Sequence, residues 1–221
     1  MSRIFMMNCR LLVILLISMN LLGKDFFIGR LKYDGGGDWY SNPSSVNNLL
    51  KFVSKESGID CSEMEGTAVV SENLNSFPYL YLTGHGTIDM TENEAELVRK
   101  HLLKGGFLHA DDNYGLDKSF RRLIKKIFPD KELVTVPFDH PIYNIKYKFP
   151  NGLPKIHEHD GKSPEGLGIF HNGRLVLFYS VESDLGDGWE DREVHNDPEE
   201  KRLQALRMGC NLVLYYLESF K

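Results

Sequence analysis

Residues 79–112 read YLYLTGHGTIDMTENEAELVRKHLLKGGFLHADD, and this stretch decides the fold. Its first part, Tyr79–Thr83, is a continuous apolar run typical of a strand covered on both faces. Thr91 and Glu94 form the T-x-x-E pattern of a capped helix start, and that helix stops at a pair of glycines. A second strand, Phe107–Ala110, ends in two aspartates. Strand, helix and strand in this order predict neighbouring parallel strands joined by a crossover helix.

The same alternation continues on both sides of this stretch. We expect further strands over 26–33, 67–71 and 133–136, a hairpin over 169–180 that turns at Asn172-Gly173, and helices over 41–57, 117–128 and from Asp197 onward. The segment 138–168 holds four prolines and little periodicity, which predicts a long irregular insertion. These patterns predict one α/β domain over 24–221, with a layered and mostly parallel sheet.

Composition and charge exclude several classes of protein. The chain has 221 residues, of which 42% are hydrophobic and 26% are charged, so it is neither disordered nor a multi-span membrane protein. The formal net charge is −5, from 26 basic and 31 acidic residues. Because a mildly acidic chain without a basic run is poorly suited to phosphate backbones, we expect no nucleic-acid partner.

The N-terminus has the pattern of an export signal. Arg3 and Arg10 precede an apolar stretch from Leu11 to Leu22, which is shorter than the about 20 residues that span a bilayer. We expect residues 1–23 to be a signal peptide, which places the mature protein in the periplasm or outside the cell without membrane contact. An uncleaved anchor through 11–22 and a buried helix are the alternatives.

Two cysteines, Cys61 and Cys210, lie beyond this segment. In an oxidising compartment they could pair, but the sequence does not give their geometry. Because Cys210 falls in an apolar helical stretch, we favour two free thiols.

Polar residues collect where the predicted strands end. In an open parallel sheet, ligands bind in the crevice beyond the carboxyl ends of the strands. The ligand-binding candidates at these ends are Asp38, Trp39, His85, Asp111, Asp112, Ser180 and Asp184. The pattern predicts a crevice that binds a small polar ligand or a peptide.

The turn after Tyr79–Thr83 resembles a sharp strand-to-helix turn. A nucleophile elbow would carry serine or cysteine at its apex, whereas here the apex is His85. An imidazole there can act as base, ligand or hydrogen-bond donor; alternatively, the glycines serve packing and the histidine is incidental. The adjacent Asp111 and Asp112 should point to opposite faces of the sheet, and local turn capping is the alternative role for them.

Metal-ligand patterns are present outside these turns. His157 and His159 in the insertion have the H-x-H spacing that puts both imidazoles on one side of an extended segment. Several carboxylates lie in 182–193, where calcium binding is conceivable, although the spacing is not that of an EF-hand. Solvated loop charge is the alternative for both groups. The candidate cofactor is therefore a divalent metal ion.

These candidates also allow a second function, that of a metal-assisted hydrolase. In it, His85 or His140 would be the base, and Asp111 or Asp112 a ligand or orienting group.

Five motifs in order resemble the domain-of-unknown-function family 4159. They are Arg30-Leu31-Lys32-Tyr33 with Gly37-Asp38-Trp39; Tyr81-Leu82-Thr83-Gly84-His85; Gly105-Gly106-Phe107-Leu108 with Asp111-Asp112; Asp139-His140-Pro141-Ile142-Tyr143; and Tyr179-Ser180 with Asp184-Leu185-Gly186. The resemblance implies a three-layer, flavodoxin-like fold similar to the class I glutamine amidotransferases, in an exported or membrane-associated bacterial protein. The family has no established reaction. Because His85 stands where the amidotransferase cysteine would be, we do not expect glutamine hydrolysis.

Overall fold

The computed structural model describes residues 25–158 and 161–219, which form a seven-stranded sheet of order β2-β1-β3-β4-β7-β6-β5. The strands are β1 (Ile28–Leu31), β2 (Gly66–Ala68), β3 (Tyr79–Leu82), β4 (Phe107–Asp111), β5 (Val134–Thr135), β6 (Glu165–His171) and β7 (Arg174–Val181). Neighbours from β2 through β7 run parallel, whereas β6 is antiparallel to β7 and β5 is antiparallel to β6. The predicted mostly parallel α/β sheet is confirmed.

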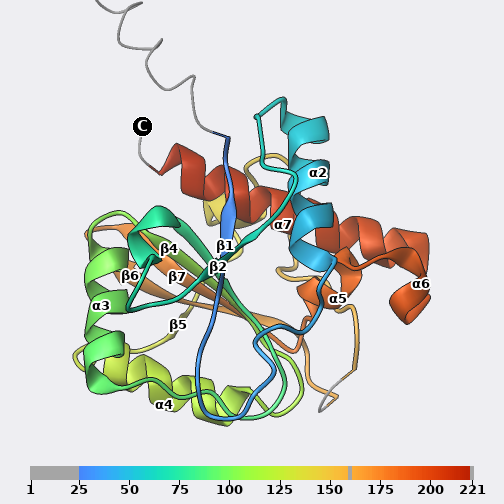
Figure 1. Cartoon of the computed structure of the whole chain (residues 1–221). Helices are drawn as coiled ribbons and strands as arrows, with labels where there is room; N and C mark the ends of the chain where they lie inside the picture. Colours follow the sequence, from blue (N-terminus) through green and yellow to red (C-terminus); the bar gives the residue numbers. More distant parts are fainter. Residues whose placement is uncertain (1–24, 159–160, 220–221) are drawn as a thin grey trace, which may run out of the picture.

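Helices cover both faces of this sheet (Figure 1). They are α2 (Ser45–Ser57), α3 (Glu92–Leu103), α4 (Asp117–Ile127), α5 (Leu185–Trp189), α6 (Arg192–His195) and α7 (Glu199–Glu218), with single 3-10 turns at Leu74–Ser76 and Pro141–Tyr143. Figure 1 shows α3 and α4 on one side of the sheet and α2 and α7 on the other. The short helix α5 packs against α2 and α7.

Alternation along the central strands divides the core in two. Leu80 and Leu82 of β3 pack with α3 and α4, whereas Tyr79 and Tyr81 pack with α2 and α7. Strand β4 follows the same alternation, because successive residues of a strand face opposite ways. These strands are therefore buried on both faces, as their continuous apolar sequence predicts.

Several predicted elements differ from the observed ones at their ends. The first strand is shorter than 26–33, because Phe26 makes only an isolated bridge to Cys61. The first helix begins at Ser45 rather than at 41, because Asn42 adopts a left-handed conformation (φ 57°) that a helix cannot contain. The last part of the 138–168 insertion belongs to β6. The segment 182–193, expected to be a loop, contains α5 and the start of α6, two helices too short to show periodicity in the sequence.

The predicted signal peptide, residues 1–23, lies outside the described residues. Within 25–158 and 161–219, we find no helix with the length and apolarity needed to cross a bilayer. Cys61 and Cys210 are both free thiols, as the helical position of Cys210 led us to expect.

Two glycines on neighbouring strands make room for one aromatic ring. Gly29 of β1 is paired in register with Gly66 of β2. A Cβ atom would lie 2.4 Å from Cγ of Phe77 at position 29, and 2.3 Å from Cε1 of the same ring at position 66. Either substitution would push the ring out of its place in the core.

We therefore expect Gly29→Ala to lower the free energy of unfolding by about 1–3 kcal/mol, which is the usual cost of overpacking. Urea unfolding followed by circular dichroism measures this loss. In a Phe77→Leu background the same substitution should cost less, because the smaller side chain can move aside. Equal costs in both backgrounds would show that contact with the ring is not the cause.

Candidate functional site

The strand order places a topological switch between β1 and β3. From β1 the chain continues into α2 on one face, and from β3 it continues into α3 on the other face. The two loops that follow these strands are hydrogen bonded to each other. Gly37 N donates to Thr87 O at 2.9 Å, and Asp34 and Asp89 exchange a pair of backbone hydrogen bonds. Ligands of open α/β sheets bind beside such a switch.

Asp38 and His85 form a pair across these two loops. The Asp38 carboxylate accepts the backbone N–H of His85, and its Oδ2 lies 3.1 Å from Nδ1 of the same histidine. The imidazole is thereby oriented although its side chain is 52% exposed. Because Nδ1 is used by Asp38, Nε2 is the ring nitrogen available to a bound molecule.

Two exposed aromatic residues lie on the loops that meet at this pair. Tyr40 is 64% exposed and Tyr114 is 67% exposed. The carbonyl of Tyr114 accepts Gly86 N at 3.4 Å, which brings the loop after β4 to the turn that carries His85. Asn113 is buried, and neither its amide oxygen nor its amide nitrogen has a hydrogen-bond partner among the described residues.

Trp39 follows Asp38 in the same loop and is partly buried. Its ring lies edge-on to Tyr40, with the Lys32 ammonium 5.8 Å from the ring centroid. This packing holds the aromatic part of the loop against β1.

Asp111 lies on the α2–α7 side of the sheet in a buried network. Its Oδ1 accepts the hydroxyl of Ser180 at 2.5 Å and Leu185 N at 3.3 Å, and its Oδ2 accepts Gly186 N at 2.6 Å. The hydroxyl of Ser180 also lies 2.9 Å from Nε2 of His109, another fully buried residue. The network therefore docks the start of α5 onto the end of β4.

Burial determines the protonation of this network. Desolvation raises the pKa of Asp111 to about 8. The hydrogen bond from Ser180 acts to lower this pKa, whereas the negative charge of Asp184 raises it further. Asp184 is itself buried in a left-handed conformation directly before α5. Burial also lowers the pKa of His109 to about 3, so its imidazole is neutral.

Asp112 points to the opposite face, as strand alternation predicts for the residue next to Asp111. It is buried, and its carboxylate helps to raise the pKa of Tyr179, whose hydroxyl donates to Asp117 at 3.1 Å. The two neighbouring aspartates therefore have separate surroundings.

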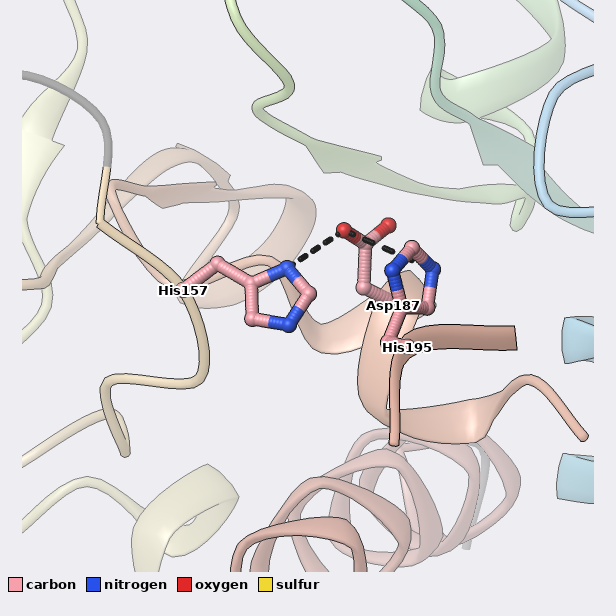
Figure 2. Close-up of side chains that lie close together, drawn as sticks. All are labelled: His157, Asp187 and His195. Carbon is pink, nitrogen blue, oxygen red and sulfur yellow. Dashed lines mark hydrogen bonds and ion pairs between the residues drawn. The ribbon is translucent and has the colours of Figure 1, made fainter. Parts of the chain in front are cut away.

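A third group of side chains gathers where the insertion meets α5 and α6 (Figure 2). Nδ1 of His157 lies 2.8 Å from Oδ2 of Asp187, and Nε2 of His195 lies 3.8 Å from the same oxygen. Hydrogen bonding to Asp187 raises the pKa of His157 to about 9, against the effect of burial. For Asp187, burial acts to raise the pKa, but the hydrogen bond from His157 and the charge of His195 outweigh it and lower the pKa.

This cluster contains one of the predicted metal ligands, His157, while His159 lies outside the described residues. His195 was not predicted, because it belongs to no short motif and approaches His157 only through the folding of α5 and α6. The sequence signal that could have identified His195 is its position close to the carboxylates that follow the hairpin.

His140 lies away from all three groups. Its ring packs 5.0 Å from that of Tyr215 and 5.7 Å from that of Phe170, centroid to centroid. Phe170 is close to the β6–β7 turn, at the amino end of β7. Burial lowers the pKa of His140. The structure thus separates His140 from His85 and Asp111.

A hollow of about 350 Å³ opens between the insertion and α7. Its lining comes from the segment 147–154 together with Glu200, Gln204 and Arg207. It contains no residue that the sequence predicts for the site.

The protonation of Asp111 predicts a pH dependence of stability. Its folded pKa is about 8, whereas an unfolded aspartate titrates near about 3.9, so folding retains a proton between these values. This contribution is complete below about pH 4 and is lost as the pH rises through about 8, at up to about 1.4 kcal/mol per pH unit. The asparagine of the Asp111→Asn variant cannot ionise. The free energy of unfolding of this variant, relative to that of the unchanged protein, should therefore rise between pH 5 and 9.

Chemical unfolding of both proteins at several pH values measures the difference. A constant difference across this range would mean that Asp111 is ionised in the folded protein.

Comparison with known proteins agrees with the sequence motifs. A search of the curated proteins found no match to this chain. The profile of the family described as domain of unknown function DUF4159 matches residues 27–217, which include β1, α7 and every element between them. The chain therefore belongs to the DUF4159 family.

Proposed function

We propose that this domain binds a small polar ligand or a peptide at the switch between β1 and β3. The observation that carries the proposal is the Asp38–His85 pair, which fixes a half-exposed imidazole at the position where open α/β sheets bind ligands. An imidazole held through Nδ1 presents Nε2 to a ligand with little loss of side-chain freedom on binding. This reduces the entropic cost of the contact.

The neighbouring groups indicate what such a ligand carries. The imidazole of His85 offers one hydrogen-bonding nitrogen, Nε2, because Asp38 engages Nδ1. The exposed rings of Tyr40 and Tyr114 offer flat apolar surface with a hydroxyl at the edge. A ligand with hydrogen-bonding groups and one apolar face, such as a sugar or a short peptide, matches this set.

Three wider assignments belong to the same proposal. The order β2-β1-β3-β4 supports a three-layer flavodoxin-like fold related to the class I glutamine amidotransferases, because flavodoxin-like sheets share this order. The basic and apolar N-terminus supports export by a signal peptide over 1–23, with the single domain at 24–221 acting in the periplasm or outside the cell. The histidine at the turn supports a function other than glutamine hydrolysis.

Hydrolysis is the second candidate function, favoured by the same pair. A carboxylate that orients an imidazole through Nδ1 is the usual arrangement of a general base, here one that would activate water. Asp111 and His140 do not enter this version, since Asp111 is engaged with α5 and His140 packs against Tyr215. Cleavage of a bound compound over time separates this function from binding alone.

We test the proposal by protein NMR with a set of amino acids, short peptides, monosaccharides and nucleotides. At least one class should shift the backbone amide signals of Asp38, His85 and Asn113. His85→Ala should weaken that binding by about tenfold or more, because it removes a hydrogen bond to a bound polar group. The control is His171→Ala, at the opposite edge of the sheet, which should bind as the unchanged protein does.

Two results would contradict the proposal. One is that no compound shifts these signals; the other is that His85→Ala binds every active compound as tightly as the unchanged protein.

A further inference from the structure

The group around Asp187 has the composition and spacing of a metal site. His157, Asp187 and His195 each offer one ligand atom, and these atoms lie within 4.8 Å of one another. Four ligands of a tetrahedral zinc ion, each about 2.0–2.1 Å from the metal, lie about 3.3 Å apart. The separations of 2.8 and 3.8 Å around Oδ2 of Asp187 bracket this value. Small rotations of the two imidazoles would bring them to ligand distance.

A fourth candidate ligand, Glu190, lies next to one of these three, His195. Oε2 of Glu190 lies 3.2 Å from Nε2 of His195, which matches the separation of two tetrahedral ligands. Figure 2 shows the carboxylate of Asp187 between the two imidazoles, with Nδ1 of His157 directed toward it. The ligand atoms therefore converge from different segments of the chain.

Three of these four ligands are also oriented by a hydrogen bond from outside the cluster. Oδ1 of Asp187 accepts the Asn42 amide at 2.6 Å, which leaves Oδ2 for the cluster. Oε1 of Glu190 accepts the hydroxyl of Ser44 at 3.2 Å, which leaves Oε2. Nε2 of His157 lies 3.0 Å from Asp197, which leaves Nδ1. Metal-binding histidines and carboxylates are usually oriented by such outer hydrogen bonds.

The charge of this cluster and its exposure to solvent both favour the binding of a cation. Asp187 contacts both imidazoles, Glu190 contacts that of His195, and Asp197 contacts that of His157, so the cluster has an excess of negative groups when the imidazoles are neutral. The side chains of His157 and His195 are each 28% exposed, so an ion can reach the two imidazoles from solvent.

We propose that His157, Asp187, His195 and Glu190 bind one divalent first-row transition-metal ion, with zinc as the reference ion. Two imidazoles select this class over calcium and magnesium, which prefer oxygen ligands only. Such an ion joins the insertion to α5 and α6. This metal site and the ligand site at Asp38–His85 use different side chains, so either can fail without the other.

The test uses the protein purified without a histidine tag, treated with chelator and then titrated with zinc. We expect one zinc ion per chain by elemental analysis, and a rise in the melting temperature that magnesium and calcium do not produce. Cobalt should replace zinc and give the absorption bands of tetrahedral cobalt.

Substitutions locate the site. His195→Ala should weaken zinc binding by more than about 100-fold, and Asp197→Asn, which removes only an outer hydrogen-bond acceptor, by about 10–100-fold. Because His195 is on the surface, its loss should leave the apo protein folded, and circular dichroism checks this. His171→Ala, outside the cluster, should bind zinc as the unchanged protein does.

The proposal is overturned by less than one zinc ion per chain at saturation, or by equal zinc affinity in His195→Ala and the unchanged protein. It is equally overturned if calcium or magnesium gives the same stabilisation as zinc. In each of these cases the cluster is an ionic network of histidines and carboxylates.

Discussion

The buried carboxyl group of Asp111 determines how α5 packs on the carboxyl ends of the strands, and the surroundings of the candidate sites depend on this packing. It lies at the end of the central strand β4 and accepts the amides of Leu185 and Gly186. A helix start has unpaired N–H groups, and a carboxyl group is a suitable partner for them even when burial keeps it protonated. A side chain at Gly186 would meet the Tyr81 hydroxyl at 2.3 Å, so the close approach of α5 to the sheet requires glycine. This docking places Asp187 above the strand ends.

A second constraint comes from Arg30 in β1. Its buried guanidinium donates to the carbonyls of Ser41 and Asn42 at 2.7 and 3.0 Å, and it pairs with Glu65. Arg30 therefore anchors the loop after β1 to the sheet, and this loop contributes a residue to each candidate site. Asp38 near its middle orients His85, and Asn42 near its end orients Asp187. The two sites share one rigid support although they share no side chain.

The sequence predicted the elements that have a strong local signal and missed those that depend on tertiary contacts. The capping box at Thr91 and Glu94 is present, because its hydrogen bonds form within one turn of chain. The apolar run of β3 sufficed to predict a buried strand. In contrast, α5 and α6 are too short for periodicity, and His195 reaches His157 only through the path of the chain across these two helices. The sequence also could not separate His140 from the other candidates, since its distance from them depends on the path of the insertion.

Two carboxyl groups in this region, Asp111 at the end of β4 and Asp187 in α5, respond to burial in different ways. Asp111 is fully buried with neutral partners, and desolvation raises its pKa, so that it holds a proton where unfolded aspartate has none. For Asp187, burial acts in the same direction, but His157 and His195 supply positive charge and lower its pKa. Gly186, whose amide is bonded to Asp111, directly precedes Asp187 in the chain. A neutral carboxyl group and a charged one therefore lie close together, and the protonated Asp111 adds no negative charge to that of Asp187 and Glu190.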